Sequence, residues 1–305
     1  MQNNYENLEN DLKNIGAIYR INEPMKKHTT FGIGGPVDFL ILPTDNSQIS
    51  NIIKSINNNN IKFCFLGSGS NILVADEGIR GAVISLKKSS KKIIFKDSTV
   101  FAECGVMLSA LVQEIHKYNI TGFETLMGVP GTLGGALIMN AGAFGSEISN
   151  NLLFVNAIDI NGNIKKYFVE DIEFSYRKSN FSENEILIDA LFKCETDSEK
   201  LINDKKNIAS NQRKKTQPLT YKSAGSIFKN PENVAAGYLI DKAGLKGMQI
   251  GEARISEKHA NFIVNLGNAK CEDVLGLIKI IKDKVFKLYG IELELEIKII
   301  GEIIN

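Results

Sequence analysis

The chain has 305 residues, of which 43% are hydrophobic and 23% charged, with a formal net charge of +1 at pH 7. This composition predicts a soluble globular protein with a sizeable core, in one large domain or two medium ones. The balanced charge argues against nucleic-acid and membrane partners. The N-terminus is acidic, and no run of about 18 apolar residues occurs, so we expect a cytoplasmic protein without a targeting segment.

Cysteine and histidine are sparse. The four cysteines lie far apart, and three of them stand in apolar, strand-like runs, which predicts reduced thiols that are mostly buried. The three histidines show no metal-ligand spacing, so we expect no metal site.

In the first half of the chain, the apolar spacing predicts helices and strands in alternation. A helix capped at residues 44–45 repeats isoleucine at helical spacing up to Ile56, and a strand follows at residues 61–66. After the loop at residues 67–71 come two further apolar runs, which predict strand, loop, strand. A second amphipathic helix carries Leu108 to Ile115 on one face.

The second half predicts a hairpin, two helices and two further strands. Residues 154–160 and 164–170 flank an Asn-Gly-Asn turn, which favours a β-hairpin, and a strand follows at residues 186–194. The charged segment 196–217 predicts a surface helix across a domain boundary. A further helix is expected at residues 273–288, and strict alternation at residues 291–299 predicts a final strand.

The stretch at residues 126–142 is the most informative part of the chain. It holds Pro130, Asn140 and five glycines among apolar side chains: Gly128, Gly131, Gly134, Gly135 and Gly142. Glycine adopts positive φ and lets a ligand or another backbone come close. We therefore expect a buried loop with room for a large, flat ligand.

A second glycine loop, Gly67-Ser68-Gly69-Ser70-Asn71, follows a predicted strand. It fails the dinucleotide fingerprint, because Ile72 stands where the third glycine belongs and a strand is expected next. Together the two loops could cradle a pyrophosphate with backbone amides and neutral donors, including Thr132. The residues alone leave this interpretation and plain structural turns both open.

Eight ordered segments from His28 to Gly301 carry a family resemblance. They read HTTFGIGGPVDF (28–39), FLGSGSNILVADEGIRGAVI (65–84), GFETLMGVPGTLGGALIMNAGAFGSEI (122–148), FSYRKSNF (174–181), AGSIFKNP (224–231), AGYLIDKAGLKG (236–247), KHANFIVNLG (258–267) and LELEIKIIG (293–301). On these segments the chain resembles the UDP-N-acetylenolpyruvoylglucosamine reductases, flavoenzymes of peptidoglycan precursor synthesis.

The resemblance implies an α+β fold with a vanillyl-alcohol-oxidase-type FAD-binding domain and a smaller C-terminal α/β substrate-binding domain. The expected boundaries are 1–197 for the first domain, 198–217 for a connecting helix and 218–305 for the second, whose last strand returns to the active site. One subgroup carries an extra loop with a tyrosine over the substrate. The short segment between Arg177 and Ile186 leaves no room for it, so we expect the shorter subgroup, as a monomer.

The resemblance also implies the cofactors. FAD is expected to bind without a covalent bond, because the first glycine loop carries Ser70 and no histidine. NADPH would donate the hydride, and UDP-N-acetylglucosamine enolpyruvate would be reduced to UDP-N-acetylmuramate. The cofactor-binding residues implied are Gly67, Ser68, Gly69, Ser70, Asn71, Pro130, Gly131, Thr132, Gly134, Gly135, Asn140 and Gly142.

Three residues match the family's catalytic positions. Arg177 would hold the substrate carboxylate, Ser226 would donate a proton, and Glu296 would act near the same carboxylate. Without the resemblance, the arginine reads as a surface cation beside Lys178 and the serine as a turn residue. The glutamate reads as one of three carboxylates on the solvent face of a strand.

Tyr176, Lys229 and Asn230 match or adjoin substrate-contacting positions, and a cationic neighbourhood from Arg213 to Lys229 would suit a diphosphate. Two rival functions remain. One is another FAD-linked oxidase of the same fold, which would not need the serine and glutamate. The other is a nucleotide-sugar or flavin-binding protein without catalysis.

Overall fold

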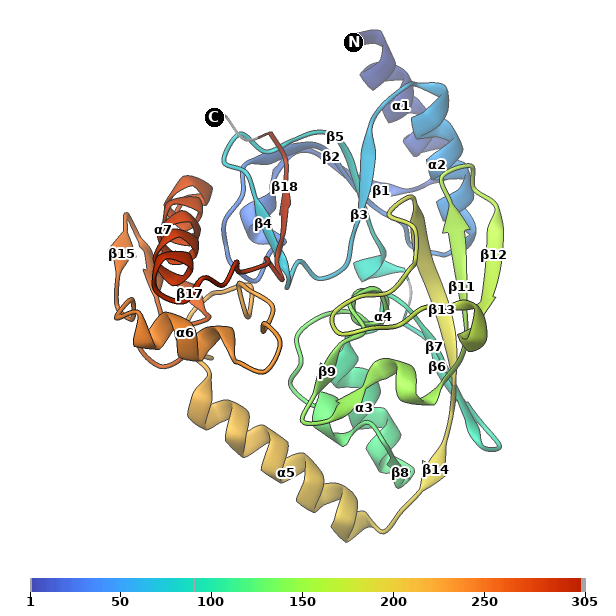
Figure 1. Cartoon of the computed structure of the whole chain (residues 1–305). Helices are drawn as coiled ribbons and strands as arrows, with labels where there is room; N and C mark the ends of the chain where they lie inside the picture. Colours follow the sequence, from blue (N-terminus) through green and yellow to red (C-terminus); the bar gives the residue numbers. More distant parts are fainter. Residues whose placement is uncertain (1, 90, 303–305) are drawn as a thin grey trace. The chain divides into compact units, whose positions relative to one another are not determined.

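The computed structural model describes residues 2–89 and 91–302. The chain forms two compact units (Figure 1). The first unit consists of Met1–Ile21, Asp38–Ser68 and Gly81–Asn211. The second unit consists of Asn22–Val37, Gly69–Arg80 and Gln212–Asn305. Each unit therefore contains segments that are distant in the sequence.

A four-stranded sheet with strand order β1-β2-β5-β3 provides one core. Its strands are β1 (Ile18–Pro24), β2 (Pro36–Leu42), β3 (Phe63–Leu66) and β5 (Ile79–Ser85), and the helices packed with it are α1 (Gln2–Ile15) and α2 (Ser47–Asn58). The predicted isoleucine face of α2 is fully buried in this core, which confirms that helix. The N-cap is Asn46, one residue after the predicted 44–45, and its side chain makes no capping bond. The Asp45 carboxylate instead accepts a hydrogen bond from the Ser47 amide at 2.8 Å.

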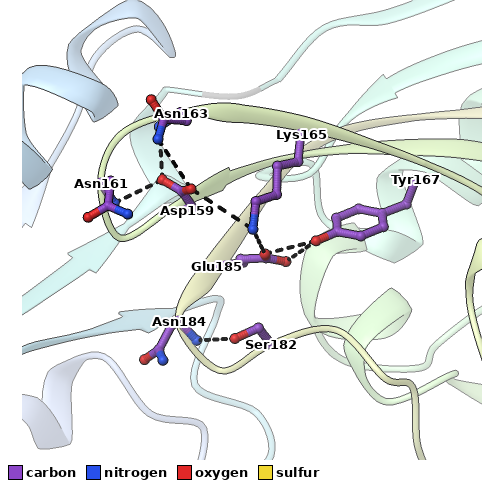
Figure 2. A network of polar contacts seen from close by, with 8 residues as sticks. All are labelled: Asp159, Asn161, Asn163, Lys165, Tyr167, Ser182, Asn184 and Glu185. Atoms are coloured by element: carbon purple, nitrogen blue, oxygen red, sulfur yellow. Dashed lines mark hydrogen bonds and ion pairs between the residues drawn. The ribbon is translucent and has the colours of Figure 1, made fainter.

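A five-stranded antiparallel sheet with strand order β12-β11-β13-β7-β6 completes the first unit. Its strands are β6 (Ile93–Lys96), β7 (Thr99–Glu103), β11 (Leu152–Asp159), β12 (Ile164–Phe168) and β13 (Glu185–Lys193). The predicted hairpin is confirmed, because β11 pairs with β12 around the Asn-Gly-Asn turn. The Asp159 carboxylate accepts the amides of Asn161 and Asn163 at 2.8 and 2.9 Å and so closes that turn (Figure 2).

Helices α3 (Leu108–Lys117) and α4 (Leu133–Ile138) share a core with this sheet. Helix α3 is the predicted second helix. Helix α4 corrects the expectation for residues 126–142, which is not a loop throughout. Leu133, Ala136 and Leu137 repeat at helical spacing and are buried, so their packing stabilises a short helix despite the neighbouring glycines.

The second unit is built around helix α7 (Cys271–Tyr289), which confirms the helix expected at residues 273–288. It packs with a three-stranded antiparallel sheet of β15 (Gln249–Ile250), β16 (Ala253–Ile255) and β17 (Ile263–Asn265), and with α6 (Ala236–Lys242). Asp76 caps the long helix: its carboxylate accepts the amides of Cys271 and Glu272 at 2.9 and 3.2 Å.

The final strand is shorter than the alternation predicts. Only β18 (Lys298–Ile300) is a strand, and it pairs in parallel with β4 (Ile72–Val74). The preceding residues instead bond to the segment around Phe228, through an isolated bridge to Leu295. The chain thus changes partner within the alternating run, which the period alone does not reveal.

The remaining elements are short, apart from α5 (Glu199–Thr216), which lies within the expected surface helix. They are β8 (Ile120–Thr121), β9 (Gly142–Ala143), β10 (Ser146–Glu147), β14 (Glu195–Thr196) and the 3₁₀ helices Met25–Lys27, Leu86–Lys88, Glu124–Leu126, Ile148–Asn151 and Val169–Asp171. Among the described residues, no helix is both long and apolar enough to cross a membrane.

The four cysteines are free thiols, as predicted, and three are buried while Cys64 is half-buried. Burial raises the pKa of Cys64 to about 11 and that of Cys271 to about 12. For Cys104 and Cys194, burial likewise raises the pKa. The thiolate forms are therefore scarce near neutral pH.

The cap on α7 makes a prediction for stability. Asp76→Ala removes the acceptor for two amides at the start of the helix, so the free energy of unfolding should fall by about 1 kcal/mol. Urea denaturation measures this loss. Asp283→Ala, at an exposed position of the same helix, is the matched control and should change little. Equal losses in both variants would show that the cap contributes nothing.

Candidate functional site

The two glycine loops meet inside the first unit. A Cβ built on Gly67 would lie 2.6 Å from the Thr132 Oγ1, closer than real side chains approach. That hydroxyl accepts the Gly135 amide at 3.4 Å and caps helix α4. The loop after β3 and the start of α4 are therefore in direct contact, as the cradle interpretation requires.

The amides at the start of α4 are already used within the first unit. The Gly134 amide donates to the Cys104 carbonyl at 2.9 Å, and the Leu133 amide donates to the Val106 carbonyl at 2.8 Å. A Cβ on Gly134 would lie 3.2 Å from the Cys104 Cβ. Close packing against Cys104 is enough to explain Gly134. Because its amide is already bonded, this residue can help a ligand only by having no side chain.

Five buried polar atoms among the described residues of the first unit have no hydrogen-bond partner: Ser68 Oγ, both ring nitrogens of His116, Thr125 Oγ1 and Asn140 Oδ1. Of these, Ser68 Oγ and Asn140 Oδ1 belong to the two glycine loops. Burying an unpaired polar atom costs free energy, so such atoms fit a polar ligand group. Together with the close approach at Gly67, the atoms in the two glycine loops are compatible with an FAD site. The residues present fit the cofactor.

The rest of the first loop belongs to the second unit. Gly69 has a φ of +69°, and a Cβ there would lie 2.2 Å from the His28 carbonyl oxygen. Its own carbonyl accepts the Thr30 amide at 3.0 Å. Only glycine fits this position, on both conformation and space. Ser70, the next residue, is half-buried.

Within the second unit, Asn71 contacts the segment of Glu296. The Asn71 side-chain amide donates to the Glu296 carbonyl at 3.0 Å, and the Asn71 carbonyl accepts the Lys298 amide at 3.0 Å. Glu296 is half-buried, whereas Glu292 and Glu294 are exposed. The environment of Glu296 thus differs from that of the other two carboxylates in the alternating run.

Glu296 and Ser226 lie on neighbouring segments of the second unit. The Glu296 amide donates to the Ile227 carbonyl at 2.8 Å, one residue from the serine. On its other side, the serine segment pairs with residues around Phe262, and the buried Asn261 bonds both backbone groups of Phe228. Two predicted catalytic residues are therefore brought together by backbone pairing.

The predicted substrate residues next to Ser226 have partners of their own. The Lys229 ammonium pairs with the exposed Glu294 carboxylate at 2.5 Å. The Asn230 side-chain oxygen accepts the Ala236 amide at 3.1 Å, at the start of α6. The structure thus shows Asn230 as a helix cap, and contact of either residue with a substrate stays a prediction.

Arg177, the third predicted catalytic residue, lies in a tight turn of the first unit. Ser175 and Lys178 exchange backbone hydrogen bonds of 3.0 and 3.1 Å, with Tyr176 and Arg177 at the corner. Arg177 has a φ of +55°, which is uncommon for a residue with a long side chain. Its guanidinium carbon lies 5.0 Å from the centre of the exposed Tyr176 ring, within cation–π distance.

This turn is fixed to the end of the glycine-rich stretch. The Arg177 Nη2 donates to the Gly142 carbonyl at 3.1 Å, and the Ser179 hydroxyl donates to the Ile138 carbonyl at 2.7 Å. The Asn140 side-chain amide donates to the Ser175 carbonyl at 3.2 Å. The glycine-rich stretch therefore also holds the predicted catalytic arginine.

The second unit has a cavity of about 360 Å³. It is lined by Lys214, Pro218, Leu219, Thr220, Tyr221, Arg254, Ser256, Glu257, Lys258 and Val264. Three of these side chains are cationic, and one is an exposed tyrosine ring. The Arg254 Nε is buried without a hydrogen-bond partner. This lining favours an anionic ligand that also carries a flat ring.

Comparison with known proteins gives a consistent result. An FAD binding domain family matches residues 37–167, and the C-terminal domain family of UDP-N-acetylenolpyruvoylglucosamine reductase matches residues 217–300. The reductase of that name from Caldanaerobacter subterraneus is 44% identical over 97% of this chain and 99% of its own length. The one from Clostridioides difficile is 41% identical over 99% of both chains.

The chain belongs to the UDP-N-acetylenolpyruvoylglucosamine reductase family. A solved reductase from Thermus caldophilus has 33% identity and a TM-score of 0.79, and the match covers 93% of this chain and 98% of that one. These matches confirm the α+β fold class, with a vanillyl-alcohol-oxidase-type FAD-binding domain and a C-terminal reductase domain. Only residues 178–184 separate Arg177 from β13, in agreement with the shorter subgroup of the family.

Sequence reasoning missed the residues that support the arginine turn of this reductase. Ser175 and Ser179 lie within the matching segment FSYRKSNF, but nothing in their spacing indicates contacts with residues 138–142. Glu147, which bonds Asn140, was also not singled out. The turn residue Gly145 hints at the β9–β10 hairpin that carries this glutamate, yet it gives no signal for the partner of the carboxylate.

The steric constraint at Gly69 can be tested with a matched pair of glycines. Gly244 has a similar φ of +68°, but a Cβ there meets nothing within 4 Å. Gly244→Ala should cost about 1–2 kcal/mol of unfolding free energy, from backbone strain alone. Gly69→Ala should cost about 2 kcal/mol more, because its Cβ collides with the His28 carbonyl. Urea denaturation compares the two, and equal costs would contradict the constraint.

Proposed function

We propose that the protein is an NADPH-dependent flavoenzyme that reduces UDP-N-acetylglucosamine enolpyruvate to UDP-N-acetylmuramate in peptidoglycan precursor synthesis. The observation that carries this function is identity of 40–44% with reductases of that name over 92% or more of the chain. FAD, when bound, would supply hydride transfer between NADPH and the substrate. Ser68 and Asn140, each with an unpaired buried oxygen, would contact this cofactor.

Arg177 would bind the carboxylate of the enolpyruvyl group. Hydride addition to the vinyl group leaves negative charge next to this carboxylate, and the charge spreads over its two oxygens. The planar guanidinium can stabilise both oxygens at once. The hydrogen bond to the Gly142 carbonyl already fixes one nitrogen, Nη2, of the Arg177 guanidinium.

Ser226 would donate the proton that completes the reduction. Its hydroxyl is a weak acid, but a carbanion stabilised by a carboxylate is basic enough to take the proton at short range. Glu296 would act beside the same carboxylate, either protonated or paired with a cation, because two bare carboxylates repel each other. The pairing between Glu296 and Ile227 supports a joint role for these residues.

The cationic cavity of the second unit would take the diphosphate and uracil ring of the substrate. Lys214 and Lys258 supply positive charge, and the Arg254 Nε is an unused donor. The Tyr221 ring offers a surface for stacking. Tyr176, Lys229 and Asn230 are proposed to contact other parts of the substrate.

The proposal extends to organisation and location. Residues 1–197 would form the FAD-binding domain and residues 218–305 the substrate-binding domain, with residues 198–217 as the helix that connects them. The protein would be a monomer in the cytoplasm. The matched families at 37–167 and 217–300 support this division. The compact units divide the chain differently, because residues 22–37 and 69–80 cluster with the second unit.

One experiment separates the proposed function from its rivals. The purified protein should carry a yellow flavin that NADPH bleaches in the absence of oxygen. Addition of UDP-N-acetylglucosamine enolpyruvate should then restore the oxidised flavin spectrum rapidly. A flavin that NADPH reduces but the substrate does not reoxidise would indicate another oxidase, and a flavin that NADPH never bleaches would indicate a binding protein.

Ser226→Ala tests the proton donor. The variant should be reduced by NADPH at nearly the normal rate but reoxidised by the substrate about 10²-fold more slowly, because only the second step needs the proton. Stopped-flow absorbance measures both steps. Ser223→Ala, three residues earlier in the same segment, is the control and should leave both rates unchanged. Equal slowing of the two steps in S226A would mean that the serine is structural.

A further inference from the structure

Asn140 connects the glycine-rich stretch of the first unit to the turn that carries Arg177. The proposed reaction needs these two segments in a fixed relative position. Asn140 is completely buried, and its φ of +40° turns the chain at the end of the glycine-rich stretch. Its side-chain amide donates two hydrogen bonds, to the Glu147 Oε2 at 2.7 Å and to the Ser175 carbonyl at 3.2 Å. Ser175 is the first residue of the turn that carries Arg177.

We propose that Asn140 and Glu147 are positioning residues, which act on the reaction through Arg177. This inference rests on the proposed function and adds to it a support for the carboxylate-binding arginine. The cofactor role expected for Asn140 concerns its Oδ1, which has no partner, whereas the positioning role uses the amide nitrogen. One side chain can therefore serve both roles.

The hairpin of β9 and β10 fixes Glu147. Its residue pairs are Gly142 with Glu147 and Ala143 with Ser146, so the glutamate lies directly opposite Gly142. The Gly142 carbonyl accepts the Arg177 guanidinium. The hairpin thus aligns two of the three contacts that hold the turn: Glu147 orients the Asn140 amide, and the Gly142 carbonyl accepts the Arg177 guanidinium.

The two ends of the arginine segment are fixed by other contacts. Phe174 and Phe181 meet edge to face at 6.2 Å, and Phe181 packs against Tyr167 in the same way at 5.6 Å. The Tyr167 hydroxyl bonds both oxygens of the Glu185 carboxylate, at 2.8 and 2.9 Å, and Lys165 pairs with it at 2.8 Å (Figure 2). The ends of the segment are thus held by the sheet.

The tip of this segment is held by the Arg177–Gly142 and Ser179–Ile138 bonds and by the Asn140 amide, which together set the tilt of the turn. This tilt matters because a guanidinium recognises a carboxylate through paired, directional hydrogen bonds. A displacement of about 1 Å at a reacting centre can cost on the order of 10²-fold in rate. Removal of the Asn140 amide is therefore expected to impair the step that involves the substrate carboxylate. Hydride transfer from NADPH does not use that carboxylate and should be spared.

Asn140→Asp is the first test, because it keeps the shape of the side chain but replaces the donor with a second acceptor facing Glu147. In the holoenzyme, reoxidation of the reduced flavin by the enolpyruvyl substrate should slow about 10- to 100-fold. The selectivity for this step is tested in Glu147→Ala, whose side chain is not among the expected cofactor contacts: its reduction by NADPH should change less than about two-fold. Asn156→Asp is the matched control, because Asn156 also donates to a carboxylate of the first unit, Asp189 at 2.7 Å, and should spare both steps.

A double-mutant cycle distinguishes positioning from general damage. If Asn140 acts through Arg177, then Asn140→Asp should have little further effect on the reoxidation rate in an Arg177→Ala background. Slowing by the same factor in both backgrounds would overturn the proposal, as would N140D reoxidation at the wild-type rate. If wild-type flavin is not reoxidised by the substrate at all, it is the proposed function that fails.

Two further measurements do not depend on N140D turnover. Glu147→Ala should slow reoxidation, and Glu147→Gln should recover most of the rate, because its amide oxygen still accepts the Asn140 hydrogen bond. Amide hydrogen exchange should accelerate at residues 174–179 in E147A and N140D but not in N156D. Equal rates in E147A and E147Q, or unchanged exchange in that turn, would contradict the proposal.

Discussion

The site depends on backbone segments that lie closer together than side chains allow. Gly67 and Gly69 stand two residues apart in one loop, yet each must be glycine for a different neighbour. In the first unit, Gly67 lies against the Thr132 hydroxyl that caps α4. In the second unit, Gly69 lies against the His28 carbonyl with a positive φ. One five-residue loop thus contains two glycines that are set by different neighbours, one in each unit. Its glycine spacing therefore follows packing and matches no phosphate-binding fingerprint.

Much of the local structure could be predicted because it follows from local periodicity. The isoleucine face of α2, the Asn-Gly-Asn hairpin and the apolar face of α7 all formed as expected. The errors arose where distant segments decide the outcome. The alternation at residues 291–299 predicts one strand, but the chain changes partner from the Phe228 segment to β4. Likewise, nothing local assigns residues 22–37 and 69–80 to the second unit, where the Asp76 carboxylate caps a helix 195 residues further on.

In the candidate site too, local patterns in the sequence predict less than the contacts between distant segments decide. Residue types and spacing left Arg177, Ser226 and Glu296 open to ordinary structural interpretations, and only the family resemblance selected them. Within the second unit, backbone pairing explains how two of them come together, since the Glu296 amide binds next to Ser226. For the arginine, the decisive facts are a turn of four residues and its contacts with residues 138–142. Such contacts join segments about 35 residues apart and leave no periodic trace in the sequence.

The positive φ of Arg177 has a consequence for how this protein could evolve. Glycine or asparagine would occupy that corner of the turn with less backbone strain, so the chain gives up stability to keep a guanidinium there. Under the proposed role of Arg177, a library selected only for thermal resistance would enrich substitutions at this codon at the expense of activity. The positive φ at this corner thus sets backbone stability against the proposed chemistry at a single codon.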